Sequence, residues 1–232
     1  MARGHDYEII SDVAHARTKL YAWLGSLSAV LAALLHKEGQ KFVEYLFGST
    51  ASKDLGWLTS LITSIGAMSI FAGLIWAFRN YVWKWPLALP FYILTGAKRP
   101  PVLLGNYEGT LTWYNTVEDE KGRSSATVSI LQSWDQMLVQ FKFSDEHGMS
   151  RAESNSEIAI LEMGLDPNRV TLKYIYRYSA AENAYQGKGI DKTSMDGTAS
   201  LHFWRVNGKW KVDGNYYSDD RGSGKITLSQ VS

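Results

Sequence analysis

Cysteine is absent from the 232 residues, which excludes disulfide frameworks, thiolate zinc sites and cysteine nucleophiles, and which suits a cytosolic domain. An excess of one sign of charge is also missing, because 24 Lys and Arg residues are matched by 23 Asp and Glu residues. Binding to duplex nucleic acid generally needs a strong positive field, so we do not expect it here. Any recognition of a nucleotide must therefore be local.

Catalytic and metal-binding patterns are missing too. The five histidines are scattered, at His5, His15, His36, His147 and His202, and no two have the spacing of metal ligands. The sequence GSGK at Gly222–Lys225 lacks the spacing of a phosphate-binding loop. Asp219 and Asp220 are adjacent in an expected turn, where neighbouring side chains point apart. We therefore expect neither an enzyme nor a bound metal or cofactor.

Two long uncharged runs are present near the N-terminus. Leu55–Phe78 contains no charged residue, and as a helix it would extend ~36 Å, enough to cross a hydrocarbon core of ~30 Å. Leu20–Leu35 is also uncharged but shorter, so the basic residues at its ends must snorkel. The sequence predicts two transmembrane helices, at about residues 20–36 and 55–78. Neither has an ionisable residue at mid-depth, so these helices are not expected to transport ions or protons.

Basic residues flank the outer ends of both runs, which predicts a multi-pass protein with both termini in the cytosol. They are Arg3, Arg17 and Lys19 before the first run and Arg79, Lys84, Lys98 and Arg99 after the second. The connecting loop carries both lysines and acids, which weakens this argument. A cleaved secretory signal is the alternative for the first run, but Asp6 and Glu8 precede it and no small-residue cleavage site follows.

Aromatic residues gather around two prolines behind the second run, between Tyr81 and Tyr92. They are typical of an interfacial belt that ends a transmembrane helix. For Leu87–Leu94 the alternative is a first buried element of the soluble domain. We divide the chain into a membrane region with its linker, residues 1–98, and a cytosolic domain, residues 99–232.

After Pro101 the hydrophobic pattern changes to alternation, in about eight short runs. In Asn106–Tyr114, for example, Tyr107, Gly109, Leu111 and Trp113 share one face. Asn207-Gly208 is a strong signal for a two-residue hairpin. Sequential hairpins without helices favour an up-and-down barrel, and a two-sheet sandwich is the alternative. The predicted fold class is therefore a membrane-anchored all-β protein.

The run Ser150–Ile160 has one face of small residues, including Ser154 and Ser156, and neither face is apolar at its start. If the small face points inward, it leaves space lined by hydroxyl groups. Gln132 and several tyrosines would make this interior both polar and aromatic, which suits a ligand with π-faces and many acceptors. These tyrosines are Tyr107, Tyr174, Tyr176 and Tyr216. The alternative is an exposed edge strand that carries charge against aggregation.

The order of these features and three motifs, GNYEGTLTWY, MDGTASL and DGNYYSDDRGSGKITL, are similar to a known family. Over essentially its full length the chain resembles the two-transmembrane, β-strand-rich effectors of bacterial CBASS antiphage systems. The resemblance implies a lipocalin-like eight-stranded barrel that binds a cyclic oligonucleotide, such as a cyclic dinucleotide, made by a partner nucleotidyltransferase (CD-NTase). Binding would promote self-association in the inner membrane, membrane disruption and death of the infected cell.

The resemblance also points to the barrel interior and mouth as the binding site. The residues it implies for cyclic-nucleotide binding are Tyr107, Trp113, Gln132, Arg151, Ser154, Tyr174, Tyr176, Tyr216 and Arg221. Tyr and Trp would stack on the bases, and Arg221, followed by Arg151, would neutralise phosphates. Each aromatic residue is equally suited to fill the core of a small barrel.

Three functions remain open from the sequence. The leading hypothesis is a ligand-gated membrane effector of antiphage defence, in which the barrel senses a nucleotide and the helices act on the bilayer. The second is a membrane-tethered, lipocalin-like carrier of lipids or other hydrophobic ligands. The third is a structural adaptor whose barrel only docks protein partners.

Overall fold

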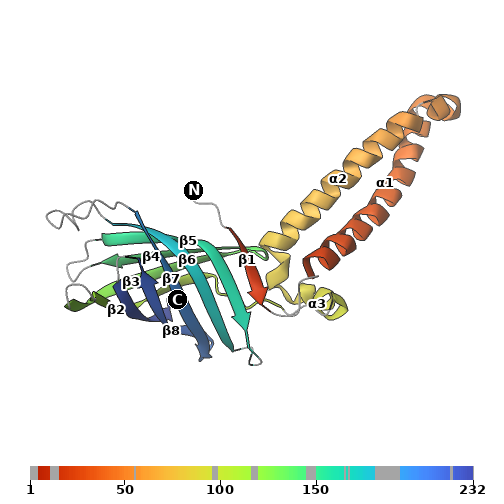
Figure 1. Cartoon of the computed structure of the whole chain (residues 1–232). Coiled ribbons are helices and arrows are strands. Elements are labelled where there is room, and N and C mark those ends of the chain that lie inside the picture. The colour runs from red at the N-terminus through yellow and green to blue at the C-terminus, as the bar shows by residue number, and fades with distance from the viewer. Residues whose placement is uncertain are drawn as a thin grey trace. The chain divides into compact units, whose positions relative to one another are not determined.

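The computed structural model describes residues 5–10, 16–54, 56–95, 99–115, 120–144, 150–164, 166, 168–180, 194–219 and 222–231. The chain forms two compact units, one helical and one made of strands (Figure 1). The helical unit is Asp12–Arg99, and the other unit combines Met1–Ser11 with Pro100–Ser232.

The helical unit contains two long helices, α1 (Ala16–Asp54) and α2 (Gly56–Asn80), which pack against each other. One helical stretch of the described residues, Thr18–Glu38 in α1, is long and apolar enough to cross a membrane, judged by length and composition alone. The predicted connecting loop after residue 36 is instead a continuation of α1. Within this continuation Lys41 pairs with Glu38 one turn away, 2.8 Å between charged atoms.

Behind α2 the chain makes two short 3₁₀ turns, η1 (Val82–Lys84) and η2 (Pro86–Ala88), and then helix α3 (Leu89–Thr95). Pro86 begins η2, where its missing N–H has no helical partner to lose. Phe91 of α3 is buried, with its ring 5.2 Å from that of Phe78 in α2. Leu87–Leu94 therefore belongs to the helical unit, and the alternative of a buried element of the soluble domain is wrong.

The second unit is a closed antiparallel barrel in which each strand pairs with the next and the last pairs with the first. The eight strands are β2 (Gly105–Asn115), β3 (Glu120–Gln132), β4 (Gln136–Ser144), β5 (Ser150–Met163), β6 (Arg169–Ala180), β7 (Ser194–Val206), β8 (Lys209–Ser218) and β9 (Gly222–Gln230). The predicted up-and-down barrel is confirmed, and the sandwich is excluded. Asn207 and Gly208 have φ values of 51° and 80° and make the predicted two-residue hairpin between β7 and β8.

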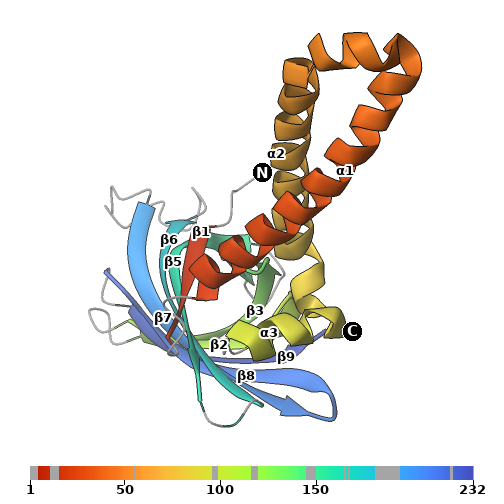
Figure 2. The ribbon, with the colours of Figure 1, turned by 90° about the vertical axis from the view of Figure 1, so that its right-hand side faces the viewer.

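A further strand, β1 (His5–Ile10), pairs with both β4 and β5, and Figure 2 shows it beside β5. It runs parallel to β5, with Tyr7 opposite Ala159, and antiparallel to β4, with His5 opposite Met137. The division by sequence assigned residues 1–98 to the membrane region, whereas the structure groups β1 with the barrel. The helical unit therefore begins after β1.

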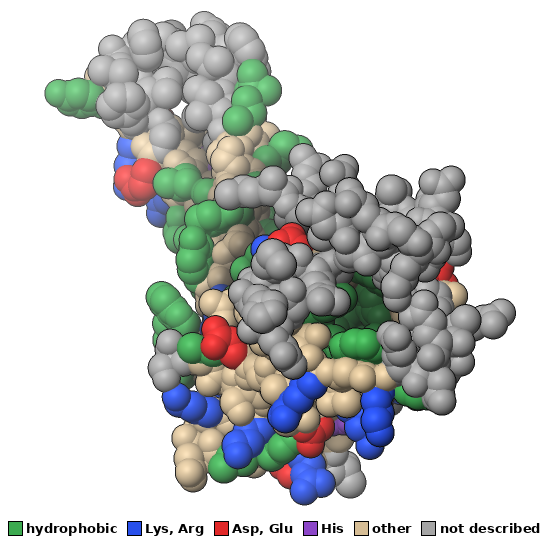
Figure 3. Space-filling model, turned by 90° about the vertical axis from the view of Figure 1, so that its left-hand side faces the viewer, with side chains coloured by type: hydrophobic (Ala, Val, Ile, Leu, Met, Phe, Trp, Pro, Cys, Tyr) green, Lys and Arg blue, Asp and Glu red, His purple; other side chains and the backbone are tan. Residues whose placement is uncertain are grey.

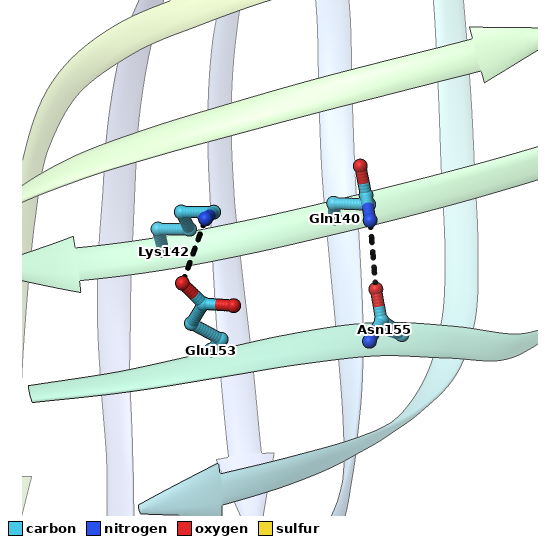
Figure 4. A network of polar contacts seen from close by, with 4 residues as sticks. All are labelled: Gln140, Lys142, Glu153 and Asn155. Atoms are coloured by element: carbon cyan, nitrogen blue, oxygen red, sulfur yellow. Dashed lines mark hydrogen bonds and ion pairs between the residues drawn. The ribbon is translucent and has the colours of Figure 1, made fainter. Parts of the chain in front are cut away.

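Away from β1, β4 and β5 pair directly, and polar side chains on their outer face connect them (Figure 4). Lys142 forms an ion pair of 2.7 Å with Glu153, and Gln140 donates a hydrogen bond of 3.2 Å to Asn155. Because β5 also pairs with β6, it is not an edge strand. Its face of small residues points inward, with Ser154 and Ser156 both buried. Of the two alternatives for this strand, the inward small face is therefore the one found.

Candidate ligand-binding site

One half of the barrel interior is filled with apolar and aromatic side chains. The ring of Phe203 lies edge-on to Tyr107, at 5.6 Å between centroids, and to Trp210, at 6.2 Å. The Tyr107 hydroxyl donates a hydrogen bond of 2.7 Å to the carbonyl of Leu103. We call this region the packed half, and define it by Leu103, Tyr107, Gln132, Phe203 and Trp210.

Tyr107 and Gln132, two of the residues expected to contact a ligand, serve this packing. Gln132 accepts a hydrogen bond of 2.8 Å from the backbone N–H of Leu103 and donates one of 3.1 Å to the carbonyl of Pro101. Burial raises the pKa of the Tyr107 hydroxyl, an effect that Arg205 partly opposes. These two side chains therefore hold the segment that leads into β2.

Across the middle of the barrel, the strand register aligns a row of residues that alternate between large aromatic and small. This aromatic row crosses six strands, as Tyr174, Ala199, Tyr216, Gly224, Trp113 and Gly122, each directly opposite the next. A second row lies two residues further along each strand, towards the packed half, and we call it the aliphatic row. It consists of Leu172, Leu201, Gly214, Ile226, Leu111 and Ser124. The side chains that line the interior thus change from mainly aliphatic to mainly aromatic between these two rows.

The glycines of the aromatic row leave room for the neighbouring rings. A Cβ atom on Gly122 would lie 2.4 Å from the indole of Trp113, and one on Gly224 would lie 2.5 Å from the ring of Tyr216. Real Cβ atoms do not approach so closely, so the rings of Trp113 and Tyr216 pack over the bare backbone of their glycine partners.

Three tyrosines follow one another on the inner face of β6, and we call them the tyrosine column. Tyr174, Tyr176 and Tyr178 are all buried, with ring centroids 5.9 Å and 6.1 Å apart. The Tyr176 hydroxyl donates a hydrogen bond of 3.2 Å to the carbonyl of Tyr217, and its ring lies over Gly197. Tyr178 was missing from the sequence-based candidates, although its alternation with Tyr174 and Tyr176 places it on the same face.

The hydroxyl of Tyr174 has no hydrogen-bond partner among the residues that the structure describes, although its side chain is only 4% exposed. Burial alone raises its pKa, so the phenol stays protonated and keeps both a donor and an acceptor. A ligand that offers a donor or an acceptor at this point would give the hydroxyl group a hydrogen-bond partner.

Hydroxyl groups complete the inner lining. Ser154 is buried and lies opposite Tyr178, whereas Ser156 accepts a hydrogen bond of 2.9 Å from the backbone N–H of Val139. In the described part of the barrel no Lys or Arg is buried. The side chains of Arg151 and Arg221, the expected phosphate contacts, lie outside the described residues. The described interior is therefore polar and aromatic without being positively charged.

The outer wall of the barrel carries charges of both signs, side by side (Figure 3). Lys173 pairs with Glu162 at 2.7 Å, and Arg177 pairs with Asp196 at 2.9 Å. Beside these pairs, β5 to β8 form a shallow apolar groove of about 300 Å³, lined by residues such as Ile158, Ile175 and Tyr217. The groove does not follow from the sequence, because alternation identifies an outer face without showing where that face is hollowed.

Of the nine residues expected to bind a ligand, the structure therefore brings Trp113, Ser154, Tyr174, Tyr176 and Tyr216 to the half of the interior beyond the aliphatic row. Comparison with known proteins adds no assignment, since no protein-family model and no curated protein matches the chain. Function must be argued from the site itself.

Proposed function

We propose that the protein is a ligand-gated membrane effector whose barrel binds a cyclic dinucleotide. The observation that carries the proposal is the aromatic row together with the Tyr174 hydroxyl, which makes no hydrogen bond to a described residue, at the point where the barrel interior turns from aliphatic to polar. Nucleobases combine a flat π-face with hydrogen-bonding edges, which are the two features this lining complements. Stacking of one base on an aromatic ring contributes about 1–3 kcal/mol.

The distribution of charge suggests how such a ligand would enter. Phosphates are poorly accommodated by a buried lining without cations, so the bases would enter the barrel and the phosphates would stay at its mouth. Arg221 and Arg151 remain our candidates for phosphate contacts there, as the resemblance to CBASS effectors implies. No cofactor other than this activating ligand is proposed.

The helices would deliver the response. We propose α2 as a second transmembrane span beside Thr18–Glu38 of α1, because the sequence from Gly56 to Phe78 carries no charge. Flanking basic residues favour a multi-pass protein of the bacterial inner membrane with the termini and the barrel in the cytoplasm. Without an ionisable residue at mid-depth, self-association of such helices suits disruption of the bilayer in abortive infection better than selective transport.

Calorimetric titration of the full-length protein in lipid nanodiscs with a panel of cyclic dinucleotides tests the sensing step, with linear dinucleotides of the same bases as ligand controls. Tyr216 points into the barrel and its neighbour Tyr217 points out, so Y216A and Y217A form a matched pair. We expect one cyclic ligand to bind and only Y216A to weaken binding. Loss of binding in Y217A alone would move the site to the outer groove, and no binding at all would overturn the proposal.

Leakage of a dye from liposomes that carry the full-length protein tests the response. We expect leakage to depend on the ligand identified by calorimetry. Leakage that is independent of ligand would contradict gating. A lipid that remains bound in native mass spectrometry and is not displaced by nucleotide would favour the hydrophobic-ligand carrier instead.

A further inference from the structure

The segment that follows α2 and ends with α3 has one buried side and one exposed apolar side. We call it the foot segment, residues Tyr81–Leu94. One side is buried against the long helices: Trp83, Phe91 and Tyr92 are nearly inaccessible, and the ring of Phe91 lies 6.5 Å from that of Trp23 in α1. The Tyr92 hydroxyl donates a hydrogen bond of 3.4 Å to the carbonyl of Trp83. The foot segment is therefore an ordered part of the helical unit.

The other side of the foot segment consists of large apolar side chains that no described residue of the chain covers. Trp85, Leu87, Leu89, Ile93 and Leu94 are between 53% and 74% exposed. Single exposed apolar residues are ordinary, but five of them within ten residues indicate an interaction site. The occupant of this surface has to be apolar where it meets these side chains.

The charged residues in and around the foot segment indicate which kind of partner covers this surface. From Leu55 to Tyr107 the sequence contains no Asp or Glu, whereas Arg79, Lys84, Lys98 and Arg99 all lie within it. In the structure, the guanidinium group of Arg99 donates a hydrogen bond to the carbonyl of Lys84, so two of these cations flank one turn of the foot segment. An apolar layer bordered by negative charge is what a leaflet of anionic lipids presents.

We propose that the foot segment lies in the interface of an anionic lipid leaflet, with its exposed apolar side chains at the acyl boundary and Lys84 and Arg99 among the head groups. Helix α3 has seven residues and extends only ~10 Å, so it lies within one leaflet. The foot segment follows α2 directly, which brings it to the end of the proposed second span. The inference rests on the membrane location in the proposed function, but it does not depend on any ligand.

The absence of cysteine makes the test direct, because one introduced cysteine is the only labelling site. Full-length I93C, V30C and K211C proteins would be labelled with an environment-sensitive fluorophore and reconstituted into phosphatidylcholine vesicles with and without phosphatidylglycerol. Val30 is an exposed residue of the apolar stretch in α1, and Lys211 is an exposed residue of the barrel. Lipids with nitroxide groups near the head group or deep in the acyl chain serve as quenchers.

We expect the Ile93 label to emit as in an apolar medium and to be quenched most by shallow nitroxides. The Val30 label should be quenched most by deep nitroxides, and the Lys211 label by neither. In anionic vesicles, K84Q combined with R99Q should reduce quenching at Ile93 at least twofold. No change in quenching would overturn the assignment of these cations to the head groups.

The remaining outcomes separate the two proposals. A water-like signal at Ile93 with a membrane signal at Val30 would overturn the inference and leave the membrane anchor intact. Water-like signals at both positions would contradict the membrane location itself. An apolar signal at Ile93 without quenching by any lipid would mean that a protein surface covers the foot segment, which would also overturn the inference. Circular dichroism of each labelled variant checks that the fold is retained.

Discussion

Trp113 on β2 lies directly opposite Gly122 on β3, and its indole occupies the space that a side chain at position 122 would need. The same arrangement recurs between Tyr216 and Gly224. Cross-strand pairs of this kind stabilise a sheet through contact between a ring and a bare backbone. The aromatic row is therefore held in place by glycines as much as by the rings themselves.

Replacing Gly122 with alanine should displace the indole of Trp113. We expect G122A to lower the free energy of unfolding by about 1–3 kcal/mol, as overpacking of an ordered interior does. Urea unfolding of the full-length protein, followed by tryptophan fluorescence, measures the change. G164A is the matched control, because its Cβ would meet its nearest neighbour at an unstrained 4.0 Å. Equal stability of the two variants would show that the indole does not depend on Gly122.

The hydroxyl of Tyr174 leads to a second prediction. Y174F removes a hydroxyl group that makes no hydrogen bond to a described residue, so stability should be unchanged. Affinity for the cyclic dinucleotide should fall up to about tenfold, since one hydrogen bond contributes about 0.5–1.5 kcal/mol. Calorimetry and urea unfolding measure the two effects.

Y176F provides the contrast for that variant, because it removes the hydrogen bond to the Tyr217 carbonyl and should destabilise the barrel by about 1 kcal/mol. A Y174F protein that is less stable but binds with unchanged affinity would mean that Tyr174 only fills the core.

Alkaline pH should weaken the fold through the same tyrosines. Burial raises the pKa of Tyr107 and of Tyr174 above the ordinary value of about 10, so between the two values the unfolded chain has lost a proton that the folded chain keeps. Stability is then independent of these groups below pH ~9 and falls above pH ~10, by up to about 1.4 kcal/mol per pH unit for each tyrosine.

Urea unfolding between pH 8 and pH 11 measures this dependence, and Y174F should reduce its slope. A slope that is the same in Y174F and in the unmodified protein would contradict the contribution of Tyr174.

The strands and their inward faces followed from the sequence because both depend on local alternation. The position of a residue along the barrel did not, since it depends on the register between strands. Tyr107 and Tyr174 both point inward, yet the register assigns the first to the packed half and the second to the aromatic row. Alternation also could not show that the side chain of Gln132 forms hydrogen bonds with backbone groups about thirty residues away, near Leu103.

Strand β1 was missed for a related reason. Its six residues, HDYEII, alternate for too short a distance to predict a strand, and their partners lie more than a hundred residues later in the sequence. The extension of α1 does not follow from the sequence either, because its charged residues suit a solvated loop as well as an exposed helix. Local composition indicates that a segment is exposed to solvent, but exposure alone does not distinguish a strand or a helix from a loop.

The place of β1 in the barrel gives the last prediction. Because β4 and β5 pair directly only at one end, removal of β1 would leave unpaired backbone groups on both strands at the other end. E8P should weaken the parallel ladder to β5, since proline cannot donate a backbone hydrogen bond. We expect faster amide exchange at Ala159–Glu162 and increased self-association in light scattering. A conservative control, E8Q, keeps the backbone donor and should behave like the unmodified protein. Unchanged exchange in E8P would show that β1 is not needed to close the gap between β4 and β5.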